Sequence, residues 1–353
     1  MTDQKENLEV SKQEQEVYDR QIRLWGMEAQ NKLRNAKVLI IGGTQLGAEV
    51  AKTLSLAGVD ALHLVDHRYV QESEVGSNFL LDASIDNTKL TKWVAARSFL
   101  TNLNRNVKLH IDETDLLSKS DSEIEAYIKD FTIVIVLDES YERTVKLNEL
   151  CRKHKVRFVS GAIFGWVGYT FFDFNGHSFL TKAEDSIETA NLDDDSQNTK
   201  TNKVVTLEED QFEPKEYTYP SFVEAFNSDF SSKKVIKKCK RVVPTSYFLV
   251  KTMLLACKEN KFSGDIVKDI EELIPIWKKE VVAGNHIVEN QPVQPEKFNH
   301  LFAPEFTPTT ACIGGIIGQE SIKAISEGKL PIRNIFIFSA LDSTGIACDF
   351  PLV

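Results

Sequence analysis

The sequence lacks three features that would assign it to large classes of proteins. No stretch approaches the roughly 20 consecutive apolar residues of a membrane-spanning helix. None of the five cysteines stands in a C-x-x-C pair, which argues against a zinc ribbon and indicates reduced thiols. Positive charge is not in excess, since the net charge is −10 at pH 7. We therefore expect no metal site, no nucleic-acid partner and no membrane partner.

What remains is the composition of a soluble globular protein. Of the 353 residues, 42% are hydrophobic and 27% are charged, and this length suffices for more than one domain. The first residues, Thr2–Asn7, are polar and contain no apolar signal-peptide core. We expect the chain to stay inside the cell.

Strand and helix patterns alternate along the first half of the chain. The run at 131–138 is continuously apolar and β-branched, as in a strand buried on both faces of a parallel sheet. Further strands are predicted at 37–41, 61–66 and 107–111, with helices at 46–56, 88–103, 121–129 and 141–154. This alternation predicts a doubly wound α/β sheet.

The domain boundaries follow from changes in composition. Residues 1–16 are polar and are predicted to be flexible, and residues 181–220 are acidic and are predicted to form a flexible linker. Residues 221–300 form a mainly helical insertion. The α/β pattern resumes at 301–353, so these residues complete the domain that begins at 17–180.

A glycine-rich turn follows the first strand. Gly42, Gly43 and Gly47 lie between that strand and a helix, where backbone N–H groups can approach a phosphate. Asp66 ends the next strand, where such folds hold a ribose hydroxyl. The middle glycine of the G-x-G-x-x-G pattern is replaced by Thr44, however, and its β-branch would obstruct close approach to a pyrophosphate.

Several motifs together resemble the adenylating subunits of the ubiquitin-like-protein activating enzymes, within the ThiF/MoeB-like superfamily. The nearest match is the smaller subunit of SUMO-activating heterodimers, which does not carry the catalytic cysteine. The resemblance covers residues 15–175 and 300–350, and it implies a Rossmann-like adenylation fold. It rests on Tyr18–Gly26 (YDRQIRLWG), Gly42–Gly47, Asp66, Asp138, Val159–Gly161 and Gly314–Glu320.

The resemblance also implies that this chain's own nucleotide site is vestigial. Lys92 matches the phosphate-binding lysine, with Lys89 as a competitor, and Asp138 matches the carboxylate near Mg²⁺. Active members carry Asn and Arg where this chain has Glu74 and Ser77. A carboxylate repels the triphosphate, and the loss of Arg removes a bidentate phosphate clamp.

Arg20 has a different implied role. The matching arginine of the family reaches into the ATP site of the partner subunit and neutralises phosphate charge there. The resemblance thus implies a heterodimer with a larger, cysteine-bearing SUMO-activating subunit that binds ATP and Mg²⁺, and only indirect contact with SUMO. It implies a nuclear protein, with the cytoplasm as a second location.

Three other interpretations stay open. One is the equivalent subunit for the Nedd-type modifier, although such subunits are longer. Another is a self-sufficient MoeB/ThiF-type homodimer, against which Thr44, Glu74 and Ser77 argue. A nicotinamide-dependent dehydrogenase would need the intact glycine pattern. The basic run 233–241 is predicted to be a solvated helix face, with a nuclear localisation signal as the alternative. Among the cysteines, Cys239 lies in this run, and we predict an unreactive thiol.

Overall fold

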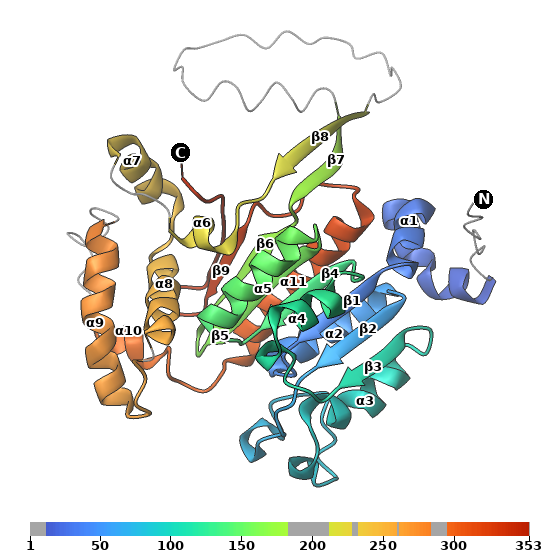
Figure 1. Cartoon of the computed structure of the whole chain (residues 1–353), viewed down its shortest axis with the longest axis horizontal. Coiled ribbons are helices and arrows are strands. Elements are labelled where there is room, and N and C mark those ends of the chain that lie inside the picture. The colour runs from blue at the N-terminus through green and yellow to red at the C-terminus, as the bar shows by residue number, and fades with distance from the viewer. Residues whose placement is uncertain (1–11, 183–211, 228–231, 260, 284–294, 353) are drawn as a thin grey trace.

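Figure 1 shows the computed structural model of the chain, which describes residues 12–182, 212–227, 232–259, 261–283 and 295–352. Its centre is an eight-stranded sheet in the order β10-β9-β6-β5-β4-β1-β2-β3. The strands are β1 Lys37–Ile41, β2 Ala61–Val65, β3 Lys108–Asp112, β4 Ile133–Leu137, β5 Arg157–Phe164, β6 Val167–Asp173, β9 Ile335–Ser339 and β10 Thr344–Cys348. Strands β1 to β5 are parallel and the others antiparallel. The doubly wound order 3-2-1-4-5 confirms the predicted fold class.

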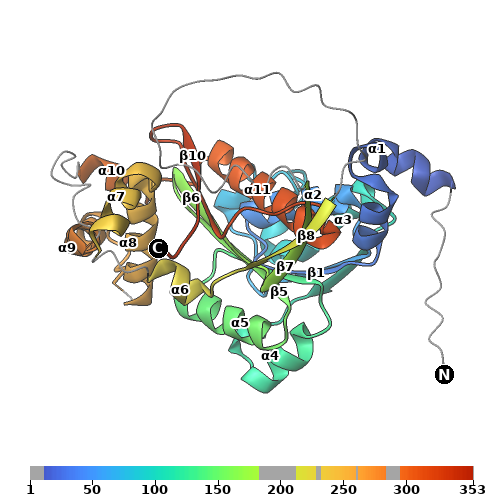
Figure 2. The same ribbon diagram turned by 90° about the horizontal axis from the view of Figure 1, so that it is seen from above.

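Helices cover both faces of the sheet, as Figure 2 shows from above. One core lies under α2 and α11, and the other under α4, α5 and α8. All five residues of β4 are buried, which is why its sequence is apolar without alternation. The helices of this body are α1 Lys12–Arg34, α2 Gln45–Ala57, α3 Lys92–Leu103, α4 Asp121–Ile128, α5 Tyr141–Lys153 and α11 Thr307–Ser326.

Helix α2 lies within one residue of the helix predicted at 46–56, whereas α1 begins inside the segment predicted to be flexible. Gly58 caps α2 in the left-handed region, with φ 79° and ψ 47°. Helix α1 starts at Lys12 and therefore includes part of the segment predicted to be flexible. Its first turns are rich in Lys, Gln and Glu, which favour helix without needing burial. Residues 1–11 of the predicted flexible segment lie outside the described residues.

The predicted linker requires a correction. A hairpin of β7 Gly176–Lys182 and β8 Phe212–Thr218 pairs Gly176 with Thr218 and Lys182 with Phe212. The hairpin takes in both ends of the segment predicted at 181–220, and residues 183–211 lie outside the described residues. Strand β8 was missed because it is polar, contains Pro214 and pairs only with β7, so it lacks the period of a core strand.

The insertion consists of helices in its described part. These are α6 Phe222–Phe226, α7 Lys233–Val242, α8 Thr245–Lys258, α9 Ile266–Ala283 and α10 Pro295–Asn299. Helix α8 packs on α5, β6 and α9, so it joins the insertion to the sheet (Figure 1). No helix of the described ranges is long and apolar enough to cross a membrane.

Helices α2 and α11 approach closely because α11 presents glycine to α2. A Cβ on Gly318 would collide with Cγ2 of Thr53, and a Cβ on Gly314 would lie 2.5 Å from Cβ of Glu49. Thr53 cannot easily turn away, because its hydroxyl donates to the carbonyl oxygen of Glu49 at 2.9 Å. These glycines therefore serve core packing between α2 and α11.

Two glycine substitutions on α11 should distinguish the effect of close packing on stability from the effect of helix propensity. We expect Gly318→Ala to lower the free energy of unfolding by about 1–3 kcal/mol, because the added methyl overpacks the α2–α11 contact. Gly315→Ala on the same helix is the matched control, since its Cβ would meet nothing within 4 Å. It should raise the free energy of unfolding by about 0.5–1 kcal/mol. Urea denaturation measures both, and equal effects would contradict the packing argument.

Candidate functional site

The glycine-rich turn retains its glycines because the backbone is crowded there. Gly42 has a φ of 110°, and a Cβ on it would collide with the carbonyl oxygen of Leu137 on β4. A Cβ on Gly43 would lie 2.7 Å from Cβ of Lys92, and one on Gly47 would collide with the carbonyl oxygen of Gly42. Packing among β1, β4 and α3 thus accounts for all three predicted phosphate-loop glycines without a ligand.

Thr44 occupies the N-terminus of α2, where a bound phosphate would lie. Its Oγ1 accepts a hydrogen bond from the backbone N–H of Gly47 at 3.3 Å and donates one to Oδ2 of Asp138 at 2.5 Å. Asp138 follows β4 with a φ of 52° and also accepts the backbone N–H of Ile163 at 3.0 Å. The helix start is therefore capped by the chain itself, and Asp138 is held by internal donors.

Asp66 stands at the end of β2, as predicted, but its oxygens are already engaged. Nε and Nη2 of Arg68 donate to it, both at 2.8 Å, and the backbone N–H of Gly43 donates at 2.6 Å. Burial alone would raise the pKa of Asp66, but these hydrogen bonds lower the pKa below its ordinary value. Sequence analysis missed Arg68, for which the only signal was a cation two residues after the acid.

Lys92, at the start of α3, faces Glu74. Its Nζ lies 2.6 Å from Oε1 of Glu74, and the two side chains are 10% and 23% exposed. Lys89 is 82% exposed and pairs with an acid of its own turn, so Lys92 is the lysine of the crevice. Ser77, which stands where active members carry Arg, is exposed. Glu74, in place of Asn, thus holds Lys92 in an internal ion pair. Ser77, in place of Arg, leaves the crevice without a second phosphate-binding cation.

Further ionic contacts extend from Arg68 along the carboxyl edge of the sheet. Nη2 of Arg68 lies 3.6 Å from Glu139, Nη1 of Arg143 donates to Glu139 at 3.4 Å, and Arg143 pairs with Asp115 at 2.9 Å. The cavity beside Asp66 and Asp115 measures only about 10 Å³, which is the minimum for one water molecule. Side chains of this chain therefore fill the crevice where a ribose would bind.

Arg20 lies on α1, apart from this crevice. The phenol of Tyr18 is buried and accepts a hydrogen bond from Asn104 at 2.9 Å, which fixes the helix on the body. Arg20 is exposed and makes no ion pair with the residues that the structure describes. Arg23, also exposed, pairs with Asp19 at 3.0 Å. No hydrogen bond or ion pair in the described ranges joins Arg20 to Asp66, Lys92 or Asp138.

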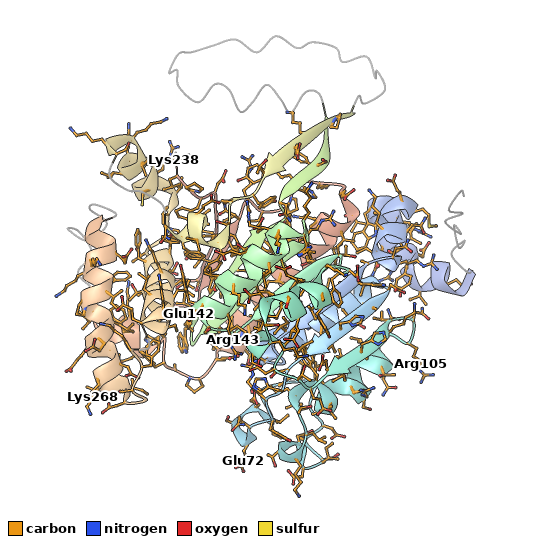
Figure 3. All side chains as sticks on the ribbon, in the orientation of Figure 1. Glu72, Arg105, Glu142, Arg143, Lys238 and Lys268 are labelled. Carbon is orange, nitrogen blue, oxygen red and sulfur yellow. The ribbon has the colours of Figure 1, made fainter. Side chains whose placement is uncertain are left out.

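The basic run forms the amphipathic helix α7, whose Lys238 is labelled in Figure 3. Val235 and Cys239 are buried, and Lys233, Lys234 and Lys237 are exposed, which confirms the predicted helix face. Burial raises the pKa of Cys239 to about 11, so little of it is thiolate at neutral pH. Within the described part of the chain, no three His, Cys, Asp or Glu side chains gather as metal ligands.

Comparison with known proteins agrees with this geometry. The chain matches the ThiF family over residues 18–348. It is 64% identical to SUMO-activating enzyme subunit aos-1 of Caenorhabditis elegans, over 98% of this chain and 100% of that protein. It is 32% identical to SUMO-activating enzyme subunit 1 of Homo sapiens, over 96% and 95% of the two chains.

A solved structure supports the fold alone. The crystal structure of selenomethionine PaaA matches with a TM-score of 0.54 at 15% identity, over 97% of this chain and 84% of that one. The family match and the two full-length relatives carry the assignment further. The chain belongs to the ThiF family, in the branch of the SUMO-activating enzyme subunit 1 proteins.

Proposed function

We propose that this protein is the regulatory subunit of a heterodimeric SUMO-activating enzyme and supplies Arg20 to the ATP site of its larger partner. In the reaction, the C-terminal carboxylate of SUMO attacks the α-phosphate of ATP, and pyrophosphate leaves. The acyl adenylate then passes to a cysteine of the larger subunit as a thioester. The full-length relatives named as SUMO-activating subunits favour this function over the Nedd-type and homodimer alternatives.

The single observation that carries the proposal is the presentation of Arg20 by α1. Successive residues of an α-helix are rotated by about 100°, so Arg20 lies about 200° from the buried Tyr18. Val17 and Leu24 fall on the same outer side and are 64% and 79% exposed. A cation that forms no ion pair with any described residue and lies between exposed apolar side chains suits a surface that a partner subunit covers.

The filled crevice supports placing ATP and Mg²⁺ in the partner. A nucleotide bound here would have to displace the hydrogen bonds of Asp66 with Arg68, of Asp138 with Thr44 and of Lys92 with Glu74. Breaking one side of a buried ion pair costs about 3–5 kcal/mol, because it leaves a charge without compensation. We further propose that the enzyme acts in the nucleus, as the family resemblance implies.

The main test is ATP–pyrophosphate exchange. We expect none from this chain alone, with or without SUMO, and exchange from the heterodimer. Arg20→Ala should lower the exchange rate of the heterodimer roughly a hundredfold, because an arginine supplied in trans contributes about 10³–10⁵ in related phosphoryl transfers. Adenylyl transfer is expected to gain less than those reactions.

Arg23→Ala is the matched control for that variant, since Arg23 is also exposed on α1 but pairs with Asp19. It should leave exchange within about threefold of wild type. Gel filtration must show that both variants still form the heterodimer. Exchange by the isolated chain would favour the homodimer, and full exchange by the Arg20→Ala heterodimer would refute the trans role.

A second test concerns the vestigial site. Lys92→Met should leave exchange by the heterodimer within about threefold, because Lys92 neutralises Glu74 and meets no ATP. Glu74→Gln, which removes the other half of the pair, is expected to behave alike. Equilibrium dialysis should find one ATP per heterodimer for the wild type and for both variants. A loss of exchange in Lys92→Met comparable to that of Arg20→Ala, with folding preserved, would restore a working site to this chain.

A third test concerns the thiols. Cys239→Ala should leave the SUMO thioester of the heterodimer unchanged on non-reducing gels, because Cys239 is buried and its pKa is raised to about 11. Cys312→Ala removes the exposed thiol of α11 and should have no effect either. Absence of the thioester in either folded variant would place the catalytic cysteine in this chain.

A further inference from the structure

A cavity of about 420 Å³ lies between the carboxyl ends of β4 and β5 and helix α8. It adjoins the filled crevice through Asp138 and Glu139, and its other walls come from the start of α5, the end of β5, α8 and the segment between α8 and α9. Asp138 and Glu139 form one wall, the rings of Tyr141, Phe164 and Phe262 another, and Cys257 faces it from α8. The volume falls in the range of ligand pockets, and the carboxyl edge of a parallel sheet is where α/β folds bind ligands.

Glu139 is the carboxylate of this wall with hydrogen-bonding capacity to spare. Its side chain is 11% exposed, yet its contacts with Arg143 and Arg68 are 3.4 and 3.6 Å long. Both distances lie beyond those of a good charged hydrogen bond, and a carboxylate can accept about four hydrogen bonds. Asp138, by contrast, is engaged by Thr44 and Ile163.

Two buried carboxyl groups, those of Asp138 and Glu139, lie at this wall, and the cations beside Glu139 contact it only at long distance. Burial raises the pKa of both Asp138 and Glu139 above their ordinary values, although Arg68 lies close to each. Helix α5 starts at the cavity with a partial positive charge, but Glu142 in its first turn offsets this charge. Figure 3 labels Glu142 at this end of α5, near α8. A cation entering the cavity would therefore be stabilised and an anion would not.

The opposite wall suits the stem and face of such a cation. Phe164 stacks on Tyr169 at a centroid distance of 6.3 Å, and Phe262 meets Phe302 edge to face at 5.7 Å, so both rings are held in place. At the same wall, Nζ of Lys258 already lies 5.1 Å from the centroid of the Tyr141 ring. Aromatic faces attract alkylammonium and guanidinium groups at such distances.

We propose that this cavity binds an alkylguanidinium or alkylammonium group, with its charged end on Glu139 and its methylene stem along Phe164 and Phe262. The group is either the side chain of an arginine or lysine from a partner protein or a small free amine. This site goes beyond the proposed function, since it requires neither ATP nor the trans-acting arginine. Its preference for a cation is the reverse of that of a phosphate site.

The test uses agmatine, a four-carbon guanidinium compound, on the full-length chain. Cys257 lines the cavity and is partly exposed, whereas Cys312 is exposed on α11, outside the cavity. Burial raises the pKa of Cys257 to about 11, so its alkylation is slow and is followed over hours at mildly alkaline pH. The rate of alkylation of each thiol by N-ethylmaleimide is followed by peptide mass spectrometry. We expect agmatine to slow alkylation of Cys257 with a saturating concentration dependence and to leave that of Cys312 unchanged. Butylurea, which is uncharged, should not protect Cys257.

Variants test whether agmatine binds through the carboxylate wall and the aromatic wall of the cavity. Glu139→Gln should raise the agmatine concentration for half-protection roughly tenfold, the effect of losing a hydrogen bond to a charged group. Phe262→Leu should also raise it, and this variant keeps the ion pairs should Glu139→Gln fail to fold. Glu149→Gln, an exposed position on α5 outside the cavity, should match wild type.

The same assay on the heterodimer distinguishes the two sources of the cation. If the partner supplies a side chain, Cys257 should be slow to react in the complex without agmatine. If the natural ligand is a free amine, agmatine should still protect Cys257 there. Absence of saturable protection in the isolated chain, equal protection by butylurea, or protection indifferent to Glu139→Gln in a folded variant would each overturn the proposal.

Discussion

The pairing of Arg68 with Asp66 determines what the carboxyl edge of the sheet can bind. A carboxylate that is 2% exposed at the side chain needs a partner, and here Arg68 provides one from two residues away. The same guanidinium reaches Glu139, which leads through Arg143 to Asp115. Two cations, Arg68 and Arg143, thereby tie together the ends of β2, β4 and β3. In a nucleotide-binding chain of this fold a bound ligand would occupy that edge, whereas here ion pairs occupy it.

The predictable part of the site is the part that strand order determines. Asp66 and Asp138 end parallel strands, and parallel strand ends share one edge, so their proximity follows from the sequence pattern. The ion pairs could not be predicted in this way. Glu74 and Lys92 are 18 residues apart, and Glu139 and Asp115 follow different strands, so their contacts depend on loop paths and rotamers. The sequence did identify Glu74 as unsuited to a phosphate, but not Lys92 as its partner.

The fold shows the same division between pattern and tertiary context. Strands such as β4 were predicted because double burial imposes a long apolar run, and α2 because its cap and periodicity agree. Strand β8 escaped prediction because its hydrogen bonds go only to β7, and such a ribbon imposes no apolar pattern. The glycines at 42, 43 and 47 show that a sequence motif can have a purely structural cause. Their presence follows from packing against β4 and α3, so a glycine-rich turn by itself is no evidence for a nucleotide.

The ion-paired crevice and Arg20 can have different functions, because separate sets of contacts hold them in place. Helix α1 is fixed by Tyr18 on Asn104, whose side chain also donates to the carbonyl oxygen of Ser55 on α2 at 2.7 Å. None of these three residues takes part in the ion pairs around Asp66. Ion pairs can therefore fill the crevice without moving Arg20, and burial of Tyr18 itself directs Arg20 outward because the two lie on opposite sides of the helix. The contact that anchors the helix is thus also the contact that presents the cation, whether or not this chain binds a nucleotide of its own.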